Sequence, residues 1–279
     1  MKKIILFLKN FSIWLFNLIF QPIRRIISTI MLFLGIWYAI IIFAIFNKVT
    51  VSGRRNLPRG QGPVLFLSNH KTFIDSFLIG LGIFNPLDFL FNYRKIPYNV
   101  AASEFFFNSK LKKIIFGLLK CKPMLRKTSN LPAFEKSVRE MANILQKESL
   151  MLFFEGGRER HGKIDECKPG VPLVIRLSLP ITIVPIFLDG IDDVLPIKQD
   201  DKRLRLHDIK TGKKIRVIIG QPIDFSDIPV ISEAKEILRS KEPFPSAMYS
   251  AEATEINNII KARVKEKVAA LDPKRIAVD

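Results

Sequence analysis

The chain has 279 residues, enough to bury a substantial core in one large domain. Its two cysteines, Cys121 and Cys167, are too few for a disulfide framework and lack the spacing of a metal site, so they indicate buried thiols in a reducing compartment. The 44 Lys and Arg against 26 Asp and Glu give a net charge of +18, which predicts an anionic partner, either nucleic acid or an anionic lipid surface.

The N-terminal region decides between these partners. It is apolar and basic, and the chain contains no acidic residue before Asp75. One apolar segment runs from Ile4 to Phe20, and a second, from Ile26 to Phe46, is uncharged. As a helix the second would be about 32 Å long, which matches a hydrocarbon core of roughly 30 Å. Nucleic-acid binding does not require such a segment, so we predict membrane lipids, and no nucleic acid, as partners.

A retained membrane anchor of two apolar helices is expected over residues 1–48. Lys9 interrupts the first apolar segment, and no small-residue cleavage site follows it, which disfavours a signal peptide. The second segment either spans the membrane or lies with the first in one leaflet. In both arrangements the basic remainder of the chain is expected on the cytoplasmic face.

Short apolar runs alternate with helical patterns in residues 49–279. The expected strands are 64–68, 98–102, one near 122–126, 150–154, 181–188 and 215–220, and the expected helices lie near 72–82, 104–119, 131–147 and 170–178. Runs that are apolar throughout and separated by helices predict an α/β fold, a buried and mostly parallel sheet with helices on both faces. Two charged helices are expected between Ser232 and Leu271.

The segment 103–120 has a basic and an apolar side. Helical spacing relates four of its apolar residues, and three lysines lie between them: Phe107, Leu111, Ile114 and Leu118, with Lys110, Lys112 and Lys113. Such a helix either packs on the sheet as a surface helix or also contacts lipid, with its lysines near the phosphate headgroups.

The stretch "NHKTFID" places His70 five residues before Asp75. On one ideal helix the two side chains would diverge by about 140°, so a contact requires a turn between them. Thr72 and Asp75 have the spacing of a capping box, which would begin a helix there. Asp75 is therefore either a capping residue alone or a cap that also holds His70, since a carboxylate can accept from both groups.

The stretch "FFEGGRERHGK" directly follows an expected strand. Gly156 and Gly157 allow close approach of the backbone to a ligand, Arg158 can bind phosphate with two parallel hydrogen bonds, and Glu155 stands at the carboxyl end of the strand. The alternative is a tight turn with solvated charges. The spacing of a Walker-type phosphate loop and of a serine-hydrolase elbow is absent.

Two further residues are less specific when taken alone. Arg126 ends the short expected strand in "CKPMLRK", where a solvated arginine is the simpler interpretation. Pro185 lies within the β pattern of "IVPIF", which indicates a sheet edge, a bulge or a strand end beside a cavity.

Together, in chain order, these stretches resemble the four blocks of the glycerolipid acyltransferase family, in particular its bacterial 1-acylglycerol-3-phosphate acyltransferases. The blocks correspond to "NHKTFID", "KPMLR", "FFEGGR" and "IVPIF", and the resemblance extends from about Leu57 to Phe225. It implies an acyltransferase domain over residues 49–279, with a mostly parallel sheet flanked by helices.

The resemblance also implies roles for the residues of each block. His70 would be the general base that accepts the proton of an acceptor hydroxyl, and Asp75 would orient it. The remaining matched positions would bind the acceptor or shape its site: Arg126, Glu155, Gly156, Gly157, Arg158 and Pro185. No metal and no cofactor is expected, because the acyl donor, acyl-CoA or acyl carrier protein, is a substrate.

The expected reaction transfers a fatty acyl group to the sn-2 hydroxyl of lysophosphatidic acid and gives phosphatidic acid for phospholipid synthesis. The "EGGR" form, with Gly157 in place of the usual threonine, is similar to that of glycerol-3-phosphate and dihydroxyacetone-phosphate acyltransferases. These acceptors, or another lysolipid, are the alternatives. A non-catalytic lipid-binding protein on the same fold is the alternative from a different class.

Overall fold

Seven strands form one sheet in the computed structural model, which describes residues 2–60, 62–124, 130–158, 163–196 and 208–276, with side chains from residue 20 to 274. Their bounds are β1 Lys48–Ser52, β2 Val64–Ser68, β3 Tyr98–Ala102, β4 Cys121–Met124, β5 Leu150–Phe153, β6 Thr182–Asp189 and β7 Lys214–Ile219. The order across the sheet is β1-β7-β6-β2-β5-β3-β4.

Neighbouring strands are parallel throughout except for β6 and β7, which are antiparallel. The predicted mostly parallel sheet is therefore confirmed. The strands at its centre, β2 and β6, are buried along almost their whole length because helices cover both faces. β1 is a strand that the sequence analysis did not predict. Its five residues pair along one edge of the sheet with β7, which is distant in sequence.

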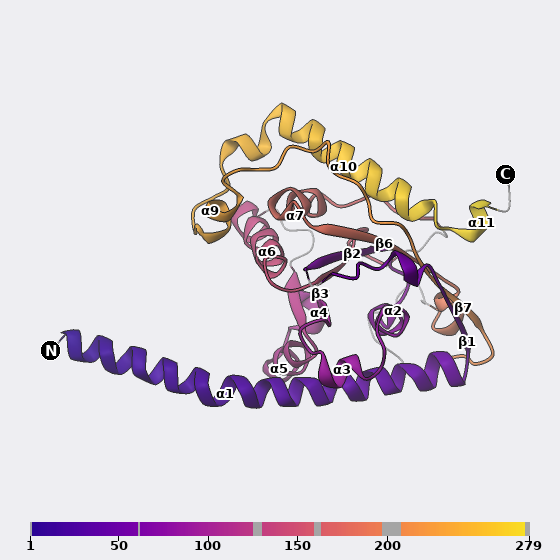
Figure 1. Cartoon of the computed structure of the whole chain (residues 1–279), viewed down its shortest axis with the longest axis horizontal. Coiled ribbons are helices and arrows are strands. Elements are labelled where there is room, and N and C mark those ends of the chain that lie inside the picture. The colour runs from indigo at the N-terminus through magenta and orange to yellow at the C-terminus, as the bar shows by residue number, and fades with distance from the viewer. Residues whose placement is uncertain (1, 61, 125–129, 159–162, 197–207, 277–279) are drawn as a thin grey trace.

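Helices lie on both faces of the sheet (Figure 1). On one face the core is closed by α6 Leu131–Ile144, α7 Gly170–Ser178, α9 Ala234–Arg239 and α10 Ala251–Ala269. On the other it is closed by α1 Lys2–Ala39, the π-helix η1 Ile40–Ile45, α2 Asp75–Ile83, α3 Asp88–Phe91 and α8 Ile191–Val194. The short elements η2 Arg54–Asn56, α4 Ser103–Phe106, α5 Lys110–Leu118, η4 Ser246–Tyr249 and α11 Pro273–Ile276 complete the described structure.

The N-terminal region is one continuous helix rather than the two that the sequence analysis expected. Pro22 lies inside α1 without ending it. A proline removes one donor from the helix ladder, and a long helix absorbs that loss as a bend. From Phe20 onward α1 runs along the body of the molecule beside α3 and α5, whereas its first turns extend beyond the body (Figure 1).

The segment 103–120 also differs from expectation, because it forms two short helices. Ser109 interrupts it, and its hydroxyl accepts from the Lys112 N–H at 3.3 Å, which caps α5. Phe107 is consequently buried, whereas Leu111 and Ile114 are 67% and 61% exposed. The four apolar residues of this segment therefore do not share one buried face.

Candidate active site

Two of the sequence motifs leave neighbouring parallel strands at the same edge of the sheet. β2 and β5 pair with Ser68 opposite Phe153, and both strands end at these residues. The segments that follow, 69–74 and 154–158, therefore begin side by side. This is the edge at which open α/β sheets bind their ligands.

The structure brings His70 and Asp75 together. Nδ1 of His70 lies 2.8 Å from Oδ2 of Asp75, and both side chains are buried. α2 begins at Asp75 itself, so the residues from 69 to 74 form a turn that folds back on the helix start. The contact required a break between the two residues, and the turn supplies it.

The Asp75 carboxylate also organises the backbone of this turn. It accepts from the backbone N–H groups of Lys71 at 2.6 Å and Thr72 at 2.9 Å, and from the Thr72 hydroxyl at 2.6 Å. The bond to the Thr72 N–H is the one that a capping box predicts, although the helix begins three residues later than Thr72. Because the carboxylate only accepts, the proton of the His70 ring lies on Nδ1, and Nε2 is left as an acceptor.

Phe153 and Asn69, to which the sequence analysis gave no role, further fix the His70 ring and the turn that carries it. Phe153 stacks on the imidazole with ring centroids 4.1 Å apart and an interplanar angle of 16°. Asn69 accepts from the Leu188 N–H at 2.8 Å and donates to the Leu188 carbonyl at 3.0 Å, which fixes the start of the turn to β6. Phe153 and Leu188 are far from this turn in sequence, so only the fold reveals these contacts.

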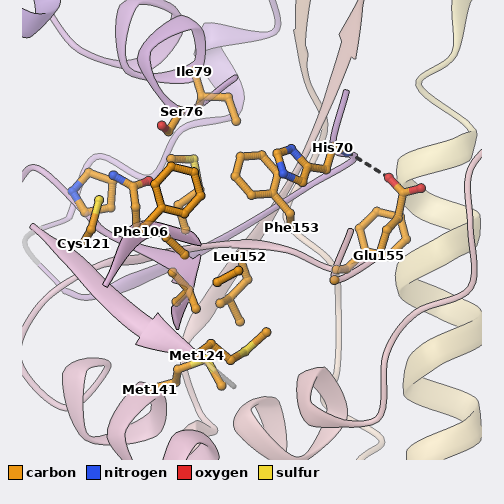
Figure 2. Close-up of a pocket in the computed structure, with 18 of the residues that line it drawn as sticks. His70, Ser76, Ile79, Phe106, Cys121, Met124, Met141, Leu152, Phe153 and Glu155 are labelled. Atoms are coloured by element: carbon orange, nitrogen blue, oxygen red, sulfur yellow. Dashed lines mark hydrogen bonds between the residues drawn. The ribbon is translucent and has the colours of Figure 1, made fainter. Parts of the chain in front are cut away.

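Glu155 contacts the backbone of two loops. Oε1 accepts from the His70 N–H at 2.9 Å (Figure 2), and Oε2 accepts from the Asp165 N–H at 2.8 Å. The side chain is 1% exposed. Glu155 therefore links the turn that carries His70 to the loop after β5. The sequence analysis expected this side chain to bind the acceptor or shape its site.

Gly156 and Gly157 follow Glu155 in the turn after β5. Gly156 has φ +61°, and a Cβ there would lie 2.7 Å from Cγ of Lys168. The glycine therefore permits both the left-handed backbone and the close passage of the lysine. Arg158 places its Cζ 3.7 Å from the centroid of the Phe73 ring, a cation–π contact that orients the guanidinium.

A cavity of about 1290 Å³ joins these residues to the apolar interior. His70, Glu155, Gly156, Gly157, Arg158 and Lys168 line it, as do many apolar side chains that include Leu32 and Ile36 of α1. In Figure 2 Cys121 and Phe106 lie on the opposite side of Phe153 from Glu155. The cavity exceeds the roughly 300–1,000 Å³ of ordinary ligand pockets and combines a charged region with a long apolar one.

The acyltransferase family model matches residues 48–189, about half of the chain. The chain belongs to the acyltransferase family. The matched region contains every site residue that the sequence predicts: His70, Asp75, Arg126, Glu155, Gly156, Gly157, Arg158 and Pro185.

Curated relatives of this chain include eukaryotic proteins. It is 27% identical over 196 residues to a tafazzin from Drosophila melanogaster, covering 67% of this chain and 49% of that protein. It is 25% identical over 223 residues to a chloroplastic 1-acyl-sn-glycerol-3-phosphate acyltransferase from Arabidopsis thaliana, covering 77% of this chain and 54% of that protein. The chain thus spans about half the length of the curated relatives it matches.

Among solved structures, this chain is similar to the 1-acyl-sn-glycerophosphate (LPA) acyltransferase PlsC from Thermotoga maritima. The two share 16% sequence identity with a TM-score of 0.46, over 76% of this chain and 94% of that one.

Arg126 and Pro185 are the two remaining site residues that the sequence predicts. Arg126 lies outside the described residues. Pro185 is buried within β6 and is not among the described residues that line the cavity. Its carbonyl accepts from the Gly220 N–H at 2.9 Å, just beyond the last β6–β7 pair. An N–H at residue 185 would point to the same side. Regular pairing of β6 with β7 ends there, so the central strand tolerates a proline at this position.

One cysteine, Cys121, also lines the cavity. Burial raises the pKa of the Cys121 thiol to about 12. At neutral pH the group therefore remains a thiol, and thiols are poor nucleophiles compared with thiolates. Cys121 is therefore a weak nucleophile at neutral pH.

Proposed function

We propose that this chain transfers a fatty acyl group from a thioester, acyl-CoA or acyl carrier protein, to the sn-2 hydroxyl of lysophosphatidic acid, giving phosphatidic acid. The observation that carries the proposal is the 2.8 Å contact of His70 with Asp75 at the wall of a cavity that is charged in one region and apolar in the rest. A lysophospholipid has the same division, with a phosphate at one end and an acyl chain at the other.

The geometry supports a direct transfer. Nε2 of His70 accepts the proton of the acceptor hydroxyl while the hydroxyl oxygen attacks the thioester carbonyl. The tetrahedral intermediate then breaks its C–S bond, and the departing sulfur takes the proton from Nε2. Asp75 keeps the Nδ1 proton in place and stabilises the imidazolium between these two steps, as the aspartate of a serine-protease triad does.

The phosphate of the acceptor belongs at Arg158 in this proposal. The guanidinium lines the cavity, and its stacking on Phe73 keeps its planar donors in a fixed orientation. The backbone of Gly157 can approach the same group, because no atom of the described residues, apart from its chain neighbours, lies within 4 Å of the place where a Cβ of that residue would stand.

The apolar part of the cavity favours an acceptor that already resides in the membrane. Leu32 and Ile36 belong to α1, and both line the cavity. The region of α1 from Phe20 through η1 to Ile45 is long and apolar enough to cross a membrane, with a mean hydropathy of 2.5. A lysolipid acceptor would therefore reach the cavity beside the helix that contacts the bilayer.

We place α1 in the plane of one leaflet. The stripe Leu32, Ile36 and Ala39 of α1, continued by Phe43 of η1, is buried against the body, so the body covers one side of the helix from residue 32 onward. The other side is also apolar and faces outward: Ile23, Ile27, Ile30, Leu34, Trp37 and Ile41. A spanning helix would have to leave these buried contacts, whereas an in-plane helix keeps them and inserts its outer side. The excess of basic residues favours the cytoplasmic face.

His70→Ala is the test of the reaction. Protein purified in detergent, given labelled acyl-CoA and lysophosphatidic acid, should lose about 10²–10⁴-fold in kcat when the base is removed, with little change in melting temperature. His207→Ala, which alters a histidine outside the four motifs, serves as the control. Full activity of His70→Ala would exclude the mechanism. A panel with glycerol 3-phosphate, dihydroxyacetone phosphate and other lysolipids identifies the preferred acceptor.

A further inference from the structure

Lys168 is a cationic residue of the cavity that none of the sequence motifs includes. It lies in the loop between Asp165 and α7, and it lines the cavity together with Gly156, Gly157 and Arg158. Its backbone is fixed at both ends, because its N–H donates to the Phe154 carbonyl at 2.9 Å and its own carbonyl accepts from the Val171 N–H at 3.1 Å.

The stem of Lys168 crosses Gly156. Its Cγ lies 2.7 Å, and its Cβ and Cε both 3.6 Å, from the place where a Cβ of residue 156 would stand. No side chain larger than hydrogen at position 156 leaves that path open. Gly156 therefore has a second effect besides its left-handed backbone. It allows the Lys168 side chain to lie over the turn that carries Arg158.

The charges around this turn require more than one cation if a phosphate monoester binds there. Such a group carries up to about two negative charges near neutral pH. Asp165 also lines the cavity and repels it. Among the described residues that line the cavity, Arg158 and Lys168 are the cations, and the ammonium of Lys168 has no ion-pair partner within the described chain.

We infer that Lys168 is a specificity-determining residue that pairs with Arg158 to bind the phosphate monoester of the acceptor. Arg158 presents oriented donors, and Lys168 supplies the second positive charge from the other end of the connection between β5 and α7. This inference rests on the proposed acyl transfer to lysophosphatidic acid, and it explains how the site would distinguish that lipid from a monoacylglycerol without phosphate.

Lys168→Met is the informative substitution. Methionine keeps an unbranched stem to lie over Gly156 and removes only the charge. We expect the acceptor KM to rise about tenfold or more, the donor KM to stay within about twofold, and the melting temperature to be unchanged. Arg158→Ala should show the same pattern, and Lys168→Arg should restore most of the affinity. Lys163→Met, an exposed lysine of the same loop that does not line the cavity, should behave as wild type.

The ratio of kcat/KM for lysophosphatidic acid to that for monoacylglycerol separates a phosphate contact from a structural role. It should fall about tenfold or more in Lys168→Met, whereas a general loss of structure would lower both values together. An unchanged ratio, or an equal rise in donor and acceptor KM, would overturn the assignment while leaving the proposed function intact. Wild-type protein that transfers no acyl group to lysophosphatidic acid would instead remove the proposed function, and this assignment with it.

Discussion

At the scale of single residues, two carboxylates hold the turn that carries His70. Asp75 binds the ring and the backbone within the turn, and Glu155 binds the His70 N–H from the neighbouring strand end. The backbone N–H of His70 is thus committed to Glu155, and the ring Nδ1 to Asp75. The imidazole is fixed in position and tautomer before any substrate enters, which is the preorganisation that a general base requires.

Glu155→Gln tests whether Glu155 positions the base or contacts the acceptor. An amide offers one oxygen, so its NH₂ group would face the N–H of either His70 or Asp165, at a cost of about 1–3 kcal/mol in the free energy of unfolding. We expect kcat to fall about tenfold or more and the acceptor KM to change little. Glu140→Gln, on the exposed side of α6, is the control. A large rise in acceptor KM with unchanged kcat would show a substrate contact instead.

The identity of the residues in the motifs was predictable from the sequence, but several of their partners were not. Local spacing predicts a helix capped by Thr72, whereas α2 begins at Asp75; the predicted bond from the Thr72 N–H to the Asp75 carboxylate is nevertheless present. Nothing near Asn69 in sequence indicates that its amide binds the Leu188 backbone, because that strand follows 119 residues later. Lys168 was missed for the same reason, since its role depends on the loop crossing Gly156.

At the scale of elements, α1 shows how one helix serves two environments. Ile36 is 1% exposed and packs on the body, whereas Leu34, two residues away, is 61% exposed. Gly35 between them allows close contact with α2, because a Cβ there would lie 2.8 Å from the Phe77 ring. The exposed apolar surface continues onto the neighbouring helices through Leu87, Phe91, Leu111 and Ile114. α1, α3 and α5 therefore present one apolar face to the surroundings.

Cysteine labelling tests the in-plane position of α1. Gln21→Cys and Lys48→Cys place thiols on either side of the apolar helix, and the native cysteines react slowly because burial raises the pKa of both Cys121 and Cys167 to about 12. In vesicles with the body outside, a membrane-impermeant maleimide should label both positions. Protection of Gln21→Cys alone, relieved when detergent opens the vesicles, would show that the helix spans the bilayer.

The same element shows the limit of pattern reading. The polar residues around Pro22 and Arg25 suggested a break between two helices, yet α1 continues through them. Arg25 lies over the Tyr93 ring with its Cζ 5.3 Å from the centroid, and Ser28 is hydrogen-bonded to the Tyr93 hydroxyl at 3.1 Å. These tertiary contacts accommodate polar groups on a helix that otherwise packs through apolar side chains.

At the scale of the whole molecule, the outer apolar side of α1 and the net charge of +18 would both favour the proposed binding to an anionic membrane surface. Lysines of α5, such as Lys110, are exposed beside the apolar residues of that helix. Apolar burial anchors a protein irrespective of lipid charge, whereas basic residues attract only an anionic surface.

A flotation assay can separate these two contributions. We expect stronger binding to vesicles that contain phosphatidylglycerol than to pure phosphatidylcholine vesicles. Raising the salt from about 0.1 M to 1 M shortens the Debye length from about 10 Å to 3 Å and should reduce the difference, because it screens the exposed lysines. Binding to pure phosphatidylcholine should persist at high salt. Equal binding to both vesicles at low salt would show that net charge has no part in membrane binding.

The sequence alone determined the fold class and the order of the central strands along the chain, and it singled out His70 and Asp75, which the structure brings into contact. Apolar runs, glycines and caps act over a few residues, so local patterns reveal them. Only the tertiary structure decided that α1 is one helix lying along the body, that Glu155 holds the His70 backbone and that Lys168 reaches the turn of Arg158. These features depend on contacts between segments far apart in the chain, where the parallel sheet and its crossovers set the geometry.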